Sequence, residues 1–285
     1  MAPRRKFRAL SLDLWFTVLS YDATSDRHWL DARTRAVSES VRRPDGGRFD
    51  DAEILGALDG LRHAAEKRGL TVEMVPSDVV QHIADTLGGR LARPLEEVAR
   101  RYSDAGLAEH PPILNPEVID VVPALERKGI PVVVVSNTAR SEATWHDVLR
   151  SLGAPPFRSI VTSCEARAGK PRREIFDEAA RRLAVAPEEI LHVGDRWTLD
   201  VEGALGAGLG AGLYRGLWPL YPPDEPADVL PPERGDRDVL VLDRLADLLR
   251  ADLWDARAGE GRPTDGPSDR HGPGPSTDRG RDARL

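Results

Sequence analysis

Residues 9–17 read Ala-Leu-Ser-Leu-Asp-Leu-Trp-Phe-Thr, an apolar run that carries Asp13 near its carboxyl end. An apolar run of this length, bounded by polar residues, predicts a buried β-strand. Two further runs, at 132–135 and 190–193, are equally apolar and also lead into polar residues. Polar groups that follow apolar strands in this way are typical of sheets whose carboxyl ends form a site.

The spacing of apolar residues differs between two regions of the chain. From Asp22 to about His110 it follows the helical repeat, and breaks at proline and glycine separate about four helices. Beyond Pro112, apolar strands alternate with amphipathic helices, which is typical of a parallel sheet covered on both faces. We therefore expect an α/β fold in which a block of helices is inserted after the first strand.

Composition narrows the class of protein. The 285 residues are 40% hydrophobic and 31% charged, and the net charge of -7 argues against nucleic-acid binding. Cys164 is the single cysteine, and no apolar stretch reaches the roughly 18 residues that a membrane span needs. No secretion signal precedes the first strand, so we expect a cytoplasmic protein. The stretch 256–285 is almost without apolar residues, and we expect it to be disordered.

The polar residues that follow the strands form a consistent set. They comprise three carboxylates, a hydroxyl, an amide and an ammonium: Asp13, Ser136, Asn137, Lys170, Asp195 and Asp200. Carboxylate oxygens are the ligands that Mg²⁺ prefers, and a carboxylate can attack phosphorus as a covalent nucleophile. A metal ion, a lysine and a hydroxyl together would neutralise a phosphoryl group. Each residue taken singly could be a turn or cap residue, but their order along the strands favours one site.

The order of these residues resembles the four signature motifs of the haloacid dehalogenase superfamily. The motifs are Asp-x-x-x-Thr from residue 13, Ser-Asn at 136–137, Lys-Pro at 170–171 and Gly-Asp-x-x-x-x-Asp at 194–200. The flanking residues 169–176 and 192–204 are similar as well, and the resemblance covers roughly 7–249. It implies a Rossmann-like core, here 1–18 and 113–255, and an all-helical cap, here 19–112, that closes over the site.

The resemblance also implies a role for each residue. Asp13 would be the nucleophile, Ser136 and Lys170 would bind the phosphoryl group, and Asp200 would support the metal or Lys170. The implied sets are catalytic, Asp13 and Lys170; substrate-binding, Ser136, Asn137, Lys170 and Trp15; and Mg²⁺-binding, Asp13, the Trp15 backbone carbonyl, Asp195 and Asp200.

One position departs from the family's pattern. Phosphatases of the family carry a second aspartate two residues after the nucleophile, which protonates the leaving group and later activates water. Trp15 stands there instead, and its indole only donates a hydrogen bond. Because general acid-base catalysis is worth about 100- to 10,000-fold, we expect poor turnover of ordinary alkyl phosphates.

Three functions follow as expectations. The first is a Mg²⁺-dependent hydrolase of a small phosphorylated metabolite, which works through an aspartyl-phosphate at Asp13 and needs a good leaving group. The second is a hydrolase of carbon–halogen or similar bonds, such as a 2-haloacid dehalogenase. The third is a degenerate, near-inactive protein that binds a ligand or a partner. The residues specify neither the substrate's identity nor an oligomeric state.

Overall fold

The computed structural model describes residues 6–66, 75–220 and 239–255. Its main sheet has six parallel strands in the order β10-β9-β8-β1-β6-β7. Their bounds are β1 Ala9–Leu12, β6 Val132–Ser136, β7 Ser159–Thr162, β8 Ile190–Gly194, β9 Gly210–Tyr214 and β10 Leu240–Leu242. The parallel α/β fold expected from the alternating pattern is confirmed.

Successive side chains of these strands enter two separate hydrophobic clusters, one on each face of the sheet. Leu10 and Leu12 pack with helices α5 (Glu117–Arg127) and α6 (Glu142–Ser151). Ala9 packs on the other face with α8 (Arg173–Leu183) and α9 (Gly203–Gly206). Burial on both faces explains why the strands are almost continuously apolar.

Shorter elements join these layers. They are α7 (Ser163–Ala166), a six-residue π-helix η2 (Trp197–Glu202), and 3₁₀ turns at Pro187–Glu189, Trp218–Leu220, Leu245–Leu249 and Ala251–Leu253. The helix expected to begin at Asp200 therefore starts three residues earlier, as the π-helix.

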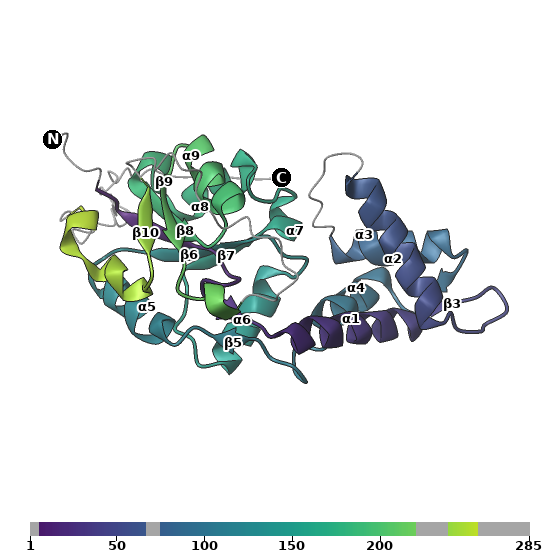
Figure 1. Cartoon of the computed structure of the whole chain (residues 1–285). Helices are drawn as coiled ribbons and strands as arrows, with labels where there is room; N and C mark the ends of the chain where they lie inside the picture. The colour runs from purple at the N-terminus through teal and green to yellow at the C-terminus, as the bar shows by residue number, and fades with distance from the viewer. Residues whose placement is uncertain (1–5, 67–74, 221–238, 256–285) are drawn as a thin grey trace, which may run out of the picture.

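Four helices between the first strand and the rest of the sheet form a separate body, which we call the four-helix unit (Figure 1). They are α1 (Ala23–Ser38), α2 (Asp51–Glu66), α3 (Pro76–Thr86) and α4 (Leu95–Asp104), and they enclose a hydrophobic cluster of their own. The unit is not wholly helical, because β3 (Val41–Arg42) pairs antiparallel with β4 (Arg90–Leu91). Gly89 makes this approach possible: an added Cβ would lie 2.7 Å from the Val41 side chain.

The chain enters and leaves the four-helix unit through one short ladder. Strand β2 (Leu19–Ser20) pairs antiparallel with β5 (Ile113–Leu114), and the Asn115 side chain donates to the Thr17 carbonyl beside it. The expected boundaries at 18/19 and 112/113 fall at this ladder.

One expectation from the sequence concerns residues outside the described ranges, because the tail 256–285 lies wholly outside them. Among the described residues, no helix combines the length and apolar character needed to cross a membrane.

Candidate active site

A cavity of about 550 Å³ opens at the carboxyl ends of β1, β6 and β8. Residues from the sheet and from α1 line it together: Asp13, Trp15, Phe16, Tyr21, Asp26, Trp29, Arg33, Asn137, Thr138, Ala139, Arg140, Lys170, Asp195, Arg196, Leu199 and Asp200. The structure thus brings Asp13, Lys170, Asp195 and Asp200 together, and we call these four residues the carboxylate–lysine cluster.

Lys170 is held between two carboxylates. Its Nζ donates to Asp13 Oδ1 at 2.5 Å and to Asp200 Oδ1 at 2.6 Å, and its side chain is only 2% exposed. Asp200 Oδ2 accepts from the backbone N–H of Arg196 at 2.9 Å. Because both oxygens of Asp200 already accept hydrogen bonds, its geometry favours the support of Lys170 over direct metal binding.

Behind Asp200 lies a fully buried histidine. His192 Nε2 is 3.1 Å from Asp200 Oδ1, and its Nδ1 is 2.9 Å from the hydroxyl of Ser11. Ser11 and His192 are register partners on adjacent strands β1 and β8. Through Asp200 and Lys170 these two strand residues join a continuous polar chain that runs from Ser11 to Asp13.

Charge and burial act against each other in this cluster. Burial raises the pKa of Asp13, an effect that the Lys170 charge opposes. Burial also opposes the charge of Lys170, but Asp13 and Asp200 raise its pKa above the usual range. For Asp200, burial would raise the pKa, yet Lys170 and His192 hold it below the usual range. Lys170 therefore stays protonated, and Asp200 stays ionised.

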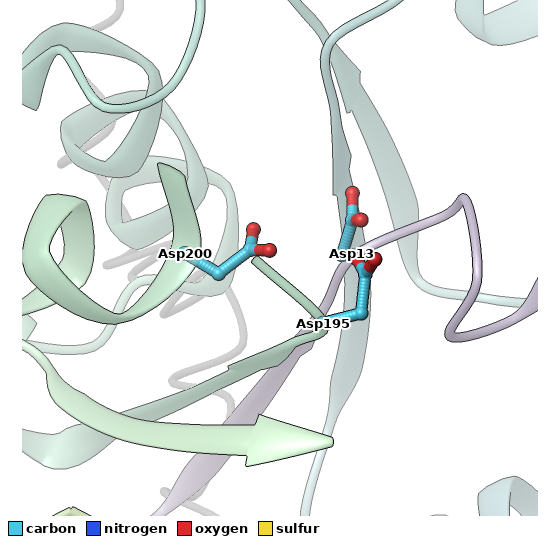
Figure 2. A group of neighbouring side chains, drawn as sticks. All are labelled: Asp13, Asp195 and Asp200. Atoms are coloured by element: carbon cyan, nitrogen blue, oxygen red, sulfur yellow. The ribbon is translucent and has the colours of Figure 1, made fainter. Parts of the chain in front are cut away.

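Asp195 is a buried carboxylate with one unsatisfied oxygen. Burial, and then the charge of Asp13, raise its pKa well above the usual range, and its Oδ1 has no hydrogen-bond partner among the residues that the structure describes. Asp13, Asp195 and Asp200 offer oxygen atoms within 4.8 Å of one another, and Figure 2 shows their carboxylates converging. A divalent cation would relieve both the repulsion and the orphaned oxygen, so Asp13 and Asp195 fit Mg²⁺, while Asp200 holds Lys170 beside them.

Glycine is required beside this cluster. A Cβ at Gly194 would lie 2.2 Å from Cγ of Asp200, because the π-helix folds Asp200 back over the end of β8. The glycine in the Gly-Asp-x-x-x-x-Asp pattern thus makes room for the second aspartate.

Ser136 and Asn137, at the end of β6, do different things. Ser136 is fully buried, and its hydroxyl has no partner in the described part of the chain, but it is not among the residues that line the cavity. The Asn137 side chain accepts from the Lys170 backbone N–H at 2.6 Å and donates to the Lys170 carbonyl at 2.9 Å. Asn137 lines the cavity, but its amide is already used to hold the Lys170 loop.

Trp15 sits in an aromatic cluster, defined here as Trp15, Tyr21, Trp29 and Trp145. Its ring centroid is 5.2 Å from Tyr21, 5.7 Å from Trp29 and 5.2 Å from Trp145. Trp29 belongs to α1 and Trp145 to α6. The indole at the acid-base position therefore packs at the contact between the four-helix unit and the sheet, while it also lines the cavity.

Sequence reasoning missed four residues of this region: Ser11, His192, Arg33 and Arg140. A signal existed for the first two, since each is a polar residue inside an otherwise apolar strand. Arg33 and Arg140 had none, because a helix surface and a loop both carry arginines routinely.

Relatives include phosphatases that match part of the chain. Glyceraldehyde 3-phosphate phosphatase of Methanopyrus kandleri is 34% identical over 47% of this chain and 58% of its own length. Phosphoglycolate phosphatase of Shigella boydii is 31% identical over 38% of this chain and 42% of its own length. The chain thus spans little more than half of the first relative. Haloacid dehalogenase-like hydrolase domain-containing protein 3 of Bos taurus is 26% identical over 78% of this chain and 87% of its own length.

Solved structures of two kinds share the fold. A 2-haloacid dehalogenase from Pseudomonas syringae aligns with a TM-score of 0.54 at 20% identity, over 85% of this chain and 96% of its own. A phosphatase from Thermococcus onnurineus aligns with a TM-score of 0.50 at 20% identity, over 84% and 95%. At this identity the likeness establishes the fold alone.

The family model of haloacid dehalogenase-like hydrolases matches residues 23–208, more than half of the chain. The match begins after Asp13 but includes the other members of the carboxylate–lysine cluster. The chain belongs to the haloacid dehalogenase-like hydrolase family.

Proposed function

We propose that this protein is a phosphohydrolase of small phosphorylated metabolites, with Asp13 as its covalent nucleophile. The observation that carries the proposal is the carboxylate–lysine cluster, in which Asp13 and the orphaned oxygen of Asp195 meet beside Lys170. Relatives named for glyceraldehyde 3-phosphate and phosphoglycolate point to the same class of substrate.

In the proposed reaction, a carboxylate oxygen of Asp13 forms a bond to phosphorus, and the bond from phosphorus to the leaving oxygen breaks. Lys170 binds the phosphoryl oxygens, while Asp200 and Asn137 hold Lys170 in place. The Ser136 hydroxyl is buried outside the cavity lining and is not assigned this role. Water then hydrolyses the aspartyl-phosphate and returns Asp13. Asp13, Asp195 and the Trp15 backbone carbonyl would hold Mg²⁺, which when bound neutralises charge on the phosphoryl group.

The absence of an acid at residue 15 limits the leaving group. Trp15 has no proton to give near neutral pH, so an alkyl leaving group would have to depart as a charged alkoxide rather than as the neutral alcohol. Phenolates and carboxylates can depart as anions. We therefore propose acyl phosphates, aryl phosphates or substrates that supply their own proton.

A dehalogenase function is the second candidate, and Trp15 is the observation that favours it. An ester at Asp13 would form by displacement of halide, and a halide needs no proton donor. The unpartnered oxygen and raised pKa of Asp195 count against it, because they fit a cation site and the displacement of halide needs no metal ion.

One experiment separates these functions from a protein that only binds. The protein is assayed against 4-nitrophenyl phosphate, acetyl phosphate, phosphoglycolate and 2-chloropropionate, each with Mg²⁺ and with a chelator. We expect Mg²⁺-dependent phosphate release that Asp13→Asn abolishes and that the exposed control Asp147→Asn leaves unchanged. Halide release that resists the chelator would establish the dehalogenase function. If no substrate is turned over, the protein that only binds a ligand or a partner is the candidate that remains.

A further inference from the structure

The cavity has a second charged feature away from the carboxylate–lysine cluster, a buried arginine. Arg140 lies in the loop between β6 and α6 and lines the cavity, yet it is only 3% exposed. Arginine is rarely buried to this extent without an ion pair, because its charge is costly to remove from water.

The protein supplies this guanidinium with aromatic rings in place of an acid. Its Cζ is 5.5 Å from the ring of Trp29 and 5.5 Å from the ring of Trp145. Its Nε and Nη2 are buried, and neither has a hydrogen-bond partner among the described residues. The rings offset part of the cost of burial but accept no N–H hydrogen bond in the plane of the group.

Nearby carboxylates do not complete it. Asp104 and Asp26 are close enough to favour its charge, but Asp104 Oδ1 is occupied by the hydroxyl of Thr144 at 3.0 Å. Within the described part of the chain, neither carboxylate forms an ion pair with Arg140. Burial lowers the pKa of Arg140 well below its usual range, and the charge of Arg33 lowers it further. An anion would relieve both effects.

Arg33 brings a second guanidinium to the same cavity from another part of the molecule. It belongs to α1 in the four-helix unit, whereas Arg140 belongs to the loop that joins β6 to α6. A ligand between them would therefore contact both bodies of the protein.

We propose that the substrate carries a second anionic group, a carboxylate or a second phosphate, that binds Arg140 with Arg33 beside it. The proposal rests on the proposed function, because the phosphate to be cleaved lies at Asp13 in the same cavity. The planar guanidinium fork matches carboxylate and phosphate oxygens, which accept two parallel N–H bonds. A cavity of about 550 Å³ suits a small molecule that spans the two ends.

The kinetic test uses two nearly isosteric aryl phosphates, 4-carboxyphenyl phosphate and its methyl ester. The ratio of their kcat/KM values is measured for the parent, for Arg140→Met and for the exposed control Arg150→Met. The intrinsic difference between the leaving groups cancels when variants are compared. We expect Arg140→Met to lower the acid-to-ester ratio by about tenfold, mainly through KM, and the control to keep the parent's ratio. An unchanged ratio in Arg140→Met would overturn the proposal.

Affinity measurements distinguish a failure of the second-anion site from a failure of the proposed function. Phosphonoacetate, 3-phosphonopropionate and propane-1,3-diphosphonate do not turn over, and their affinities are compared with that of propylphosphonate by calorimetry with Mg²⁺. The two carboxylate ligands test for a carboxylate as the second anionic group, and the diphosphonate tests for a second phosphate. Suppose that the parent, but not Arg140→Met, binds a ligand with a second anionic group more tightly than propylphosphonate, and that no ester is hydrolysed. That result would overturn the proposed function but support the second-anion site. Hydrolysis with no such preference would do the reverse. Arg140→Gln repeats both measurements if the Met variant does not fold.

Discussion

Two buried cations line one cavity, and the protein treats them in opposite ways. Lys170 donates to Asp13 and to Asp200, whose other contacts come from His192 and a backbone N–H. Arg140 packs near two indole rings, and two of its nitrogen atoms have no partner within the described ranges. A cation whose partners are built into the fold holds other residues in place. A cation left without partners is available to a ligand, and its cost is borne until that ligand binds.

The sharpest way to break this contrast is to remove each charge and measure stability. Lys170→Met leaves Asp13 and Asp200 buried without their shared cation, and we expect a loss of about 3–5 kcal/mol in the free energy of unfolding. Arg140→Met replaces an unpaired charge with an apolar chain, so we expect no loss or a gain. Urea denaturation at pH 7 without ligand gives both values. Equal losses for the two variants would mean that Arg140 has a structural partner after all.

The next largest effect concerns Trp15, which lines the same cavity as the two cations. Trp15→Asp places an acid two residues after Asp13, and we expect at least about a tenfold rise in kcat/KM on alkyl phosphates. Part of the gain is offset because the substitution leaves a cavity in the aromatic cluster. Rates on phosphoglycolate and 4-nitrophenyl phosphate are compared, with Trp15→Asn as the uncharged control. A parent that hydrolyses both esters equally, with chemistry rate-limiting, would show that another residue gives the proton.

The smallest expected effect is a pH-dependent stabilisation by Mg²⁺, which tests the role of Asp195. The pKa values of Asp13 and Asp195 are raised in the folded protein, so the stability tied to their protonation is present at low pH and lost as pH rises through these values. Mg²⁺ competes with those protons, and its affinity should fall several-fold from pH 8 to pH 5. Melting temperatures with and without Mg²⁺ should therefore differ more at pH 8 than at pH 5. Asp195→Asn should remove the difference, while an identical response at both pH values would contradict it.

The strands and the carboxylate–lysine cluster were predictable because their chemistry is local. Asp13 and Asp195 follow apolar runs directly, and parallel pairing then brings strand ends to one edge. The use of Asn137 to hold Lys170 was not predictable, since it depends on how a loop 33 residues away returns to β6. The surroundings of Arg140 were not predictable either, because the two indole rings that contact it come from α1 and α6. The β3–β4 ladder could not be predicted from the sequence, because a strand of two residues is too short to show a periodic pattern.

The ladder of β2 and β5 also makes the molecule divisible. Leu19 faces Leu114 and Ser20 faces Ile113, so the two crossings already have the register of a hairpin stem. A two-residue Asn-Gly turn could close that stem in place of 21–112, because such turns match the twist of antiparallel strands. The sheet would keep its order, since none of its six strands lies in the excised segment. Recombination at this one place could thus graft a different helical unit, and with it a different choice of ligand, onto an unchanged set of carboxylates.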